Sequence, residues 1–186
     1  MSAPHSSAAG CLLYFSEDAD MAIRAARAAS LEPLAIERHR FPDGELRLRL
    51  PESLPARVVV WRSLYDPNEK LVELLLSART ARTLGAQHLS LAAPYLAYMR
   101  QDIAFRPGEV VSQRIVGQFL SELFDAVITV DPHLHRVATL EEAIPVLDAV
   151  VLSGAPVLAD LVHRHRPQAL LMGPDEESAQ WVAQAA

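Results

Sequence analysis

Cysteine is almost absent from this chain, since Cys11 is the only one among 186 residues. No disulfide can form within the chain, which is typical of proteins from a reducing compartment. The chain also has no apolar run of the roughly 20 residues needed to cross a bilayer, and residues 1–10 lack the positive charge and apolar core of a secretory signal. These absences exclude a disulfide-stapled domain, and we expect a soluble, cytoplasmic protein with a loose tail over residues 1–10.

Positively charged residues are fewer than negatively charged ones. The chain has 17 Lys and Arg residues and 23 Asp and Glu residues, which gives a formal net charge of -6. This balance argues against a protein that coats nucleic acid through a basic surface. It remains compatible with a local cationic pocket for a phosphorylated small molecule.

Short apolar runs alternate with helical patterns along most of the chain. Strands are expected at residues 12–15, 58–61, 89–93, 126–130, 149–152 and 169–172. Helices are expected at residues 20–29, between the cap Asp66 and Gly85, around 111–123, at 156–163 and from 178 onward. Strands that alternate with helices of this length are joined by right-handed crossovers. The pattern predicts an α/β fold with a mostly parallel sheet flanked by helices.

Apolar spacing predicts which faces of the two central helices are buried. The helix after Asp66 should bury Leu71, Leu74, Leu75, Ala78 and Ala81, and the helix around 111–123 should bury Val111, Ile115, Val116, Phe119, Leu120 and Leu123.

A turn sequence, Pro42-Asp43-Gly44, separates two extended runs at residues 35–40 and 45–50. Proline presets a turn φ and glycine accepts positive φ, so this segment predicts a hairpin.

The chain should divide near residue 147. We expect residues 11–146 to form one domain of this α/β type, and residues 147–186 to be the truncated beginning of a second, similar domain. Two short strands and their helices bury little surface unaided. The helix that carries Trp181 should therefore expose apolar surface and favour association between chains.

Three polar clusters follow predicted strands or the predicted turn. Arg100, Gln101 and Asp102 come after the strand at 89–93, and Asp131-Pro132-His133 follows the strand at 126–130. The carboxyl ends of parallel strands meet at one rim of a sheet, where open α/β folds bind ligands. The guanidinium of Arg100 is a fixed fork of donors suited to phosphate oxygens.

The hairpin adds a different set of groups. The ring of Phe41 can stack on a purine, and the carboxylates of Asp43 and Glu45 can accept hydrogen bonds from an exocyclic amine. Plainer interpretations stay open: Phe41 as a hairpin plug, Asp43 as a turn former, and Glu45 as a solvated strand residue.

Other polar residues also have plainer interpretations. His133 can be a hydrogen-bonded core histidine and His135 a bystander. Asp102 can bind a metal or orient Arg100, and we favour orientation. Residues 163–166 are better explained as cations at a helix C-terminus than as a metal or anion site.

From about Leu12 onward the chain resembles ribose-phosphate diphosphokinase, also called phosphoribosyl diphosphate synthetase. Three segments carry the likeness in the same order and at similar spacing: Phe41-Pro42-Asp43-Gly44-Glu45, Pro94-Tyr95-x-x-Tyr98-x-Arg100-Gln101-Asp102 and Asp131-Pro132-His133. This family uses Mg²⁺ to transfer the β,γ-diphosphoryl group of ATP to the 1-hydroxyl of ribose 5-phosphate. Its subunits contain two phosphoribosyltransferase-like domains and assemble into oligomers, so the resemblance implies a homo-oligomer that acts in nucleotide biosynthesis.

The resemblance also implies roles for single residues. Phe41, Asp43 and Glu45 would contact the adenine of a neighbouring subunit's ATP. Arg100, Gln101 and Asp102 would bind the nucleotide, with Arg100 also catalytic. His133 would lie at the phosphates and metal as a catalytic and metal-associated residue. Asp175, in Gly173-Pro174-Asp175, matches a metal-associated aspartate.

The sequence departs from the family pattern in three places. Ile103-Ala104-Phe105 replaces a polar stretch, Pro132 replaces a leucine, and Glu176-Glu177-Ser178 replaces small residues. The paired aspartates and Thr-rich turn that grip ribose 5-phosphate are missing, as is the mobile basic loop before them. We therefore expect this chain to be inactive alone, as the N-terminal part of the enzyme.

Two other functions remain open. A non-catalytic regulatory or scaffold homologue would bind catalytic subunits or nucleotide without turnover, as the apolar segment 103–105 and the missing loop suggest. A phosphoribosyltransferase-like domain with another nucleotide substrate is disfavoured, because the acidic loop of such enzymes is the part that is missing.

Overall fold

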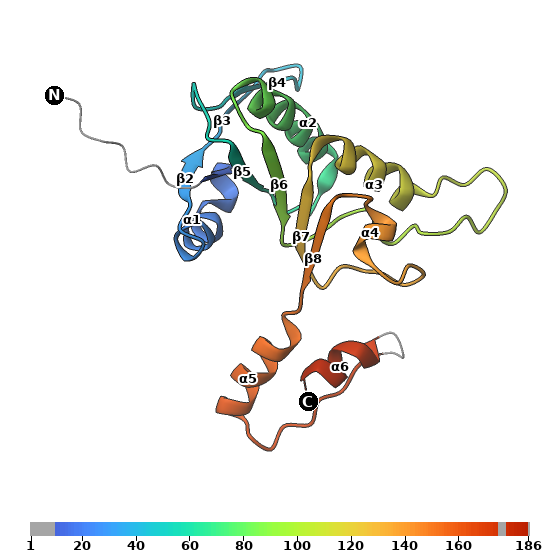
Figure 1. The fold of residues 1–186 in the computed structure, drawn as a ribbon. Coiled ribbons are helices and arrows are strands. Elements are labelled where there is room, and N and C mark those ends of the chain that lie inside the picture. Colours follow the sequence, from blue (N-terminus) through green and yellow to red (C-terminus); the bar gives the residue numbers. More distant parts are fainter. Residues whose placement is uncertain (1–9, 175–177, 186) are drawn as a thin grey trace.

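A single parallel sheet organises the chain in the computed structural model, which describes residues 10–174 and 178–185. The elements run in this order: β1 (Cys11–Tyr14), a 3-10 turn η1 (Ser16–Asp18), α1 (Ala19–Ala28), β2 (Glu32–Ala35), β3 (Glu37–Arg40), β4 (Leu46–Arg49), β5 (Arg57–Trp61), α2 (Pro67–Thr83), β6 (His88–Ala93), α3 (Ser112–Leu123), β7 (Ala126–Val130), α4 (Leu140–Ala143), β8 (Asp148–Leu152), α5 (Ala155–His165) and α6 (Ala179–Ala185) (Figure 1).

Six strands lie in the order β2-β1-β5-β6-β7-β8, and every neighbouring pair is parallel. Strands β3 and β4 form a separate antiparallel pair. The expected α/β fold with a mostly parallel sheet and a hairpin is therefore confirmed.

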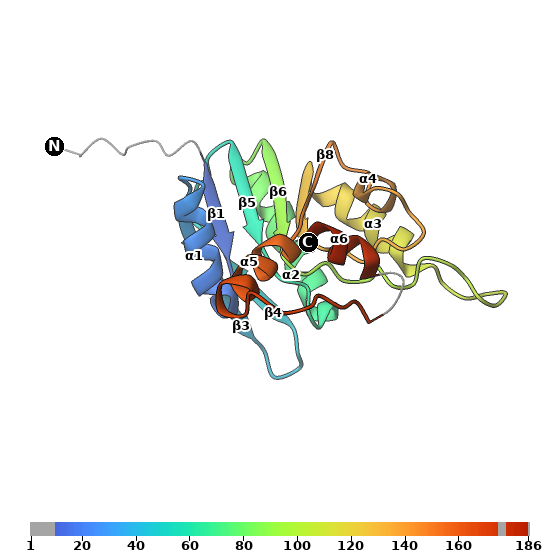
Figure 2. The same ribbon diagram turned by 90° about the horizontal axis from the view of Figure 1, so that it is seen from below.

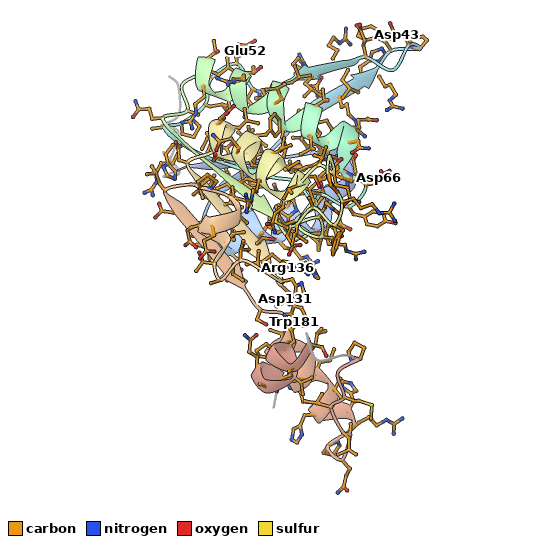
Figure 3. All side chains as sticks on the ribbon, turned by 90° about the vertical axis from the view of Figure 1, so that its right-hand side faces the viewer. Asp43, Glu52, Asp66, Asp131, Arg136 and Trp181 are labelled. Carbon is orange, nitrogen blue, oxygen red and sulfur yellow. The ribbon has the colours of Figure 1, made fainter. Side chains whose placement is uncertain are left out.

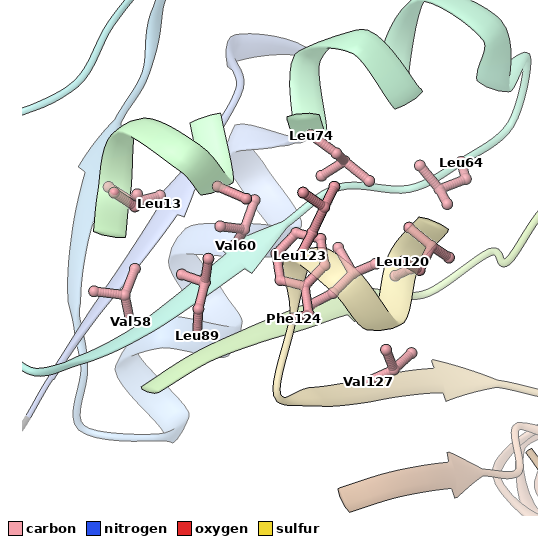
Figure 4. Close-up of a cluster of buried hydrophobic side chains, with 14 of the residues drawn as sticks. Leu13, Val58, Val60, Leu64, Leu74, Leu89, Leu120, Leu123, Phe124 and Val127 are labelled. Carbon is pink, nitrogen blue, oxygen red and sulfur yellow. The ribbon is translucent and has the colours of Figure 1, made fainter. Parts of the chain in front are cut away.

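Side chains of β1 show how the sheet is covered on both faces. Cys11 and Leu13 point into the larger core, which includes Leu74 of α2 and Leu120 of α3. Leu12 points to the other face, where it packs with buried alanines of α1. This alternation is the period-two pattern of a strand buried on both sides. Figure 2 shows α1 on one face of the sheet and α2 and α3 on the other, and Figure 4 shows the larger core.

The lone cysteine, Cys11, is the first residue of β1 and has the properties of an inert thiol. Burial raises the pKa of Cys11 to about 11, with a further contribution from the charge of Glu32. A thiol with this pKa stays protonated at neutral pH and is a poor nucleophile.

The β3–β4 hairpin closes through the turn that the sequence predicts. The Phe41 amide donates to the Glu45 carbonyl at 2.8 Å, and the Gly44 amide donates to the Phe41 carbonyl at 2.9 Å. Gly44 has φ of 93°, and Asp43 accepts a hydrogen bond from the Glu45 amide at 3.1 Å. The hairpin projects from the body of the molecule, with Asp43 at its tip (Figure 3).

Several local predictions were wrong. Asp66 has φ of 51° and its side chain makes no capping hydrogen bond, so it precedes α2 without capping it. Leu75 and Ile115 are exposed although the apolar spacing placed them in buried stripes. Helices α2 and α3 contact each other, but no neighbouring element covers the faces that carry Leu75 and Ile115 among the described residues.

The segment at residues 169–172 does not form the expected strand. An extended segment becomes a strand only when a neighbour satisfies its backbone groups, and no strand pairs with it in the part of the chain that the structure describes. The short strand β2 was not predicted from the sequence. It lies at the opposite edge of the sheet, next to β1.

The C-terminal part begins with β8, which pairs with β7 as the last strand of the main sheet. The strand expected to open a second domain is therefore part of the first sheet, and the domain boundary near residue 147 stays a prediction. Helices α5 and α6 lie beyond the end of this sheet and contact each other (Figure 1). The last turn of α5 carries His163, Arg164 and His165, at the helix C-terminus as expected.

A bilayer-spanning helix is not found within residues 10–174 and 178–185, since none there combines the required length with sufficient apolarity.

Candidate functional site

A cavity of about 600 Å³ lies at the carboxyl edge of the parallel sheet. Its walls come from the segments that follow three adjacent strands: residues 64–67 after β5, 95–101 after β6 and 130–133 after β7, with Ser112 and Trp181 completing it. The Leu64 amide donates to the Tyr95 carbonyl at 2.8 Å, so two of these segments remain joined beyond the ends of their strands. This position is where open α/β sheets bind ligands.

Arg100, Gln101 and His133 all line this cavity. Arg100 is exposed, and no residue within 10–174 or 178–185 forms a hydrogen bond or ion pair with its side chain. The Gln101 side-chain amide donates to the Ile103 carbonyl at 2.8 Å. The His133 ring lies 6.1 Å, centroid to centroid, from that of His135, which does not line the cavity. The cavity thus combines an uncommitted guanidinium with an imidazole from the neighbouring strand end.

Backbone strain is concentrated around the same cavity. Asp66, Tyr98 and Asp131 line it and have φ of 51°, 62° and 42°, in the left-handed region that disfavours side chains. The Tyr98 hydroxyl hydrogen-bonds to the Asn68 side-chain oxygen, and Asp131 Oδ2 accepts from the Gly154 amide at 2.9 Å. Strained residues of this kind cluster at functional sites, where the surrounding structure holds them in place.

The hairpin residues do not reach this cavity within one chain. Phe41, Asp43 and Glu45 are exposed and absent from its walls. The Phe41 ring contacts the His39 ring edge-on at 4.8 Å. In Figure 3 Asp43 lies at the upper end of the molecule, well away from Asp131 and Arg136, which lie near its middle.

Asp102 forms no hydrogen bond or ion pair with the Arg100 side chain, so the expected direct orientation of Arg100 by this carboxylate is not seen. Its side chain is buried, and its Oδ1 accepts a hydrogen bond from Arg136 Nη1 at 2.7 Å. The chain turns at this point, so that Arg100 faces the cavity while Asp102 faces the interior. Sequence alone does not show this pairing, because 34 positions separate the two partners.

The metal-associated residues are only partly described. Asp175 lies outside the described residues, and no group of three or more His, Cys, Asp or Glu side chains placed for a metal occurs among those that the structure describes. One imidazole, that of His133, and two carboxylates, those of Asp66 and Asp131, line the cavity. Mg²⁺ keeps several waters and takes few protein ligands besides substrate phosphates. The donor set therefore fits Mg²⁺ that is held mainly through phosphate oxygens of a ligand.

A buried ion-pair network next to the end of β5 was not predicted from the sequence. Arg62, directly after β5, is 1% exposed and pairs with Glu73 of α2 at 2.5 Å. It also pairs with Asp18 at 2.9 Å and Glu17 at 3.1 Å, both of η1. Arg38 of β3 pairs with Glu17 and Glu73. The network thus ties the base of the hairpin to the sheet and to α2.

The charges of this network control the ionisation of Glu17. Burial opposes ionisation, but hydrogen bonds from its backbone and from Arg62, together with the charges of Arg62 and Arg38, lower the pKa of Glu17 from 4.5 to about 2. A carboxyl group with a lowered folded-state pKa stabilises the fold above its unfolded pKa, and this contribution is lost as the pH falls toward the folded value.

Replacement of Glu17 by glutamine is therefore expected to destabilise the protein at pH 7 by about 1 kcal/mol or less, because the group is partly exposed and screened. The difference from the wild type should shrink as the pH falls from 4.5 toward 2. Urea unfolding at several pH values would measure it. A difference that stays constant across this range would contradict the assignment.

Comparison with known proteins gives a consistent result. A family model described as the N-terminal domain of ribose phosphate pyrophosphokinase matches residues 11–123. Ribose-phosphate pyrophosphokinase from Methanopyrus kandleri is 41% identical over 131 residues, which cover 70% of this chain and 44% of that protein. The enzyme of the same name from Thermococcus kodakarensis is 32% identical over 150 residues, 81% of this chain and 52% of that protein.

Among solved structures, the crystal structure of phosphoribosylpyrophosphate synthetase from Mycobacterium smegmatis matches with a TM-score of 0.78 and 20% sequence identity. The match covers 94% of this chain and 60% of that chain, and it supports the fold. The chain spans about half the length of the curated relatives it matches. From the match of the family model over residues 11–123, the chain belongs to the ribose-phosphate pyrophosphokinase family, in the region of that family's N-terminal domain.

Proposed function

We propose that this chain carries the ATP-binding part of a cytoplasmic ribose-phosphate diphosphokinase, the enzyme that makes phosphoribosyl diphosphate for nucleotide biosynthesis. The full reaction transfers diphosphate from Mg-ATP to ribose 5-phosphate. The observation that carries the proposal is the meeting of Arg100, Gln101 and His133 in one cavity at the carboxyl edge of the sheet. The names of the relatives support the reaction.

The residues of the cavity suit the proposed substrate. Arg100 has no protein partner within the described ranges, so its guanidinium is available to bind phosphate oxygens in a bidentate manner. Gln101 would contact the nucleotide beside it. Transfer of this kind depends on positioning and on neutralisation of charge, which Mg²⁺ supplies when bound. His133 would lie near the metal-bound phosphates, with Asp175 as a further metal-associated residue.

The hairpin would complete the site from a second copy of the chain. Phe41, Asp43 and Glu45 are exposed on an element that projects away from the cavity of its own chain. We propose that they contact the adenine bound to a neighbouring protomer of a homo-oligomer.

We propose that the 186-residue chain binds nucleotide but does not catalyse diphosphate transfer alone. Its sequence holds no pair of adjacent aspartates followed by a Thr-rich turn, and residues 147–186 would contribute to the opening of a second domain. The scaffold alternative is favoured by the exposed apolar side chains of Ile103 and Phe105, where the family is polar. Phosphoribosyl diphosphate formation by the purified chain would overturn the first statement. Failure to bind ATP by a chain that still associates with a catalytic homologue would favour the scaffold.

Replacement of Arg100 by alanine is expected to weaken ATP binding about 10- to 100-fold, because hydrogen bonds to charged groups contribute about 1.5–3 kcal/mol. Isothermal titration calorimetry with ATP and Mg²⁺ would measure the change in Kd. Arg57→Ala is a matched control, since Arg57 is also exposed but begins β5 at the opposite edge of the sheet. Equal Kd values for Arg100→Ala and the wild type would remove Arg100 from the site.

A further inference from the structure

The segment that carries Arg100 is fixed to its surroundings on both sides. The Gln113 side-chain amide donates to the Met99 carbonyl at 3.2 Å, and the Gln113 backbone amide donates to the Gln101 carbonyl at 3.2 Å. Gln113 lies in the first turn of α3, whose backbone amides have no partner within the helix. Arg136 then binds the Asp102 carboxylate at 2.7 Å. The backbone around Arg100 is thus held while its side chain stays uncommitted.

The Asp102–Arg136 contact differs from an ordinary surface ion pair. The Asp102 side chain is 1% exposed, whereas that of Arg136 is 41% exposed. Asp102 Oδ2 is buried and has no hydrogen-bond partner within the described residues. Arg136 therefore supplies the charge that compensates this carboxylate, and a buried charge without such a partner is strongly unfavourable. The Arg136 guanidinium also lies 5.9 Å from the centroid of the Phe105 ring, on the same loop as Asp102.

The sequence positions of the two partners give the pair its significance. Asp102 lies two residues after Arg100, on the segment that follows β6. Arg136 lies three residues after His133, on the segment that follows β7. The pair is therefore a direct link between the two segments that bring Arg100 and His133 to the cavity.

We propose that Arg136 is a positioning residue for nucleotide binding. Arg136 does not line the cavity, so it would act on the nucleotide without direct contact. Through Asp102 it fixes the segment after β6 relative to the segment after β7, so that the Arg100 guanidinium and the His133 imidazole face one phosphate chain. This inference rests on the proposed function, because it assumes that the cavity binds ATP.

The test compares variants of Arg136 in the full chain. Arg136→Ala is expected to raise the Kd for Mg-ATP about tenfold, since loss of a group that orients a ligand typically costs 10- to 100-fold. Arg136→Lys keeps the positive charge and should stay within about threefold of the wild type, because charge pairing with Asp102 is preserved. Arg164→Ala is the matched control, since it breaks an exposed ion pair with Asp160 on α5, and it should leave the Kd unchanged.

A second readout needs no nucleotide. Amide hydrogen exchange of the peptides covering residues 99–111 should become faster in Arg136→Ala and stay at the wild-type rate in Arg136→Lys and Arg164→Ala. Should Arg136→Ala not fold, the double variant Asp102→Asn with Arg136→Ala removes the buried charge together with its partner. It should show the same loss of affinity and the same faster exchange.

The two readouts separate failure of the link from failure of the proposed function. A wild-type chain that does not bind Mg-ATP would refute nucleotide binding, while exchange would still report on the link. Unchanged exchange in Arg136→Ala would overturn the link whether or not ATP binds. Faster exchange with an unchanged Kd would show a purely structural pair and would overturn the positioning role.

Discussion

Replacement of Arg62 by alanine is expected to lower the free energy of unfolding by about 3–5 kcal/mol, the loss typical when one partner of a buried ion pair is removed. Glu73 is fully buried and, among the residues that the structure describes, would keep only Arg38 as an ionic partner. The guanidinium also lies 4.5 Å from the centroid of the Phe15 ring, a contact that would be lost as well. Urea unfolding at pH 7, followed by far-UV circular dichroism, would measure the change.

Two further variants test the cause of this loss. Arg49→Ala breaks an ion pair with Glu37 in which both side chains are well exposed, and its effect should be far smaller. The double variant Arg62→Met with Glu73→Leu should recover most of the lost stability, because it removes both buried charges and keeps apolar volume. A loss below about 1 kcal/mol for Arg62→Ala would show that the network contributes little.

Replacement of Gly117 by alanine is expected to destabilise the protein by about 1–3 kcal/mol, the usual cost of overpacking a buried contact. A Cβ at this position of α3 would lie 1.8 Å from the Ala143 carbonyl oxygen and 3.0 Å from its carbonyl carbon. These are backbone atoms, so relief requires α3 and α4 to move apart.

The clash and the helix propensity of alanine act in opposite directions at residue 117. Alanine favours an isolated helix over glycine by about 1 kcal/mol, so without the clash the substitution would stabilise the protein. Gln118→Ala, at the next and exposed position of the same helix, is the control and should change stability little. Urea unfolding of both variants would decide, and a stabilised Gly117→Ala would show that α3 and α4 are not in close contact.

The sheet could be predicted from the sequence because its signals are local. The strand at 126–130 and the one at 89–93 are apolar runs that end at polar residues, and β7 and β6 match them to within a residue. Parallel strands place these ends at one edge, so the meeting of Arg100 and His133 in one cavity also follows from the sequence. Their chemical roles stay predictions.

Other features depend on contacts that no local pattern records. Arg62, on the segment after β5, and Glu73, on α2, are 11 positions apart, and a charged residue within a helix gives no sign that it will be buried. Ile115 follows the helical period, but exposure depends on which neighbour covers that face. The apolar run at 169–172 has strand composition without a strand beside it.

Asp66, at the cavity wall, has a backbone conformation that is unfavourable for a residue with a side chain. Its backbone is left-handed and its exposed side chain forms no hydrogen bond or ion pair with any residue that the structure describes. Glycine would suit this backbone better. Selection for thermal stability alone would therefore replace Asp66 by glycine and give a more stable protein with one carboxylate fewer at the cavity wall.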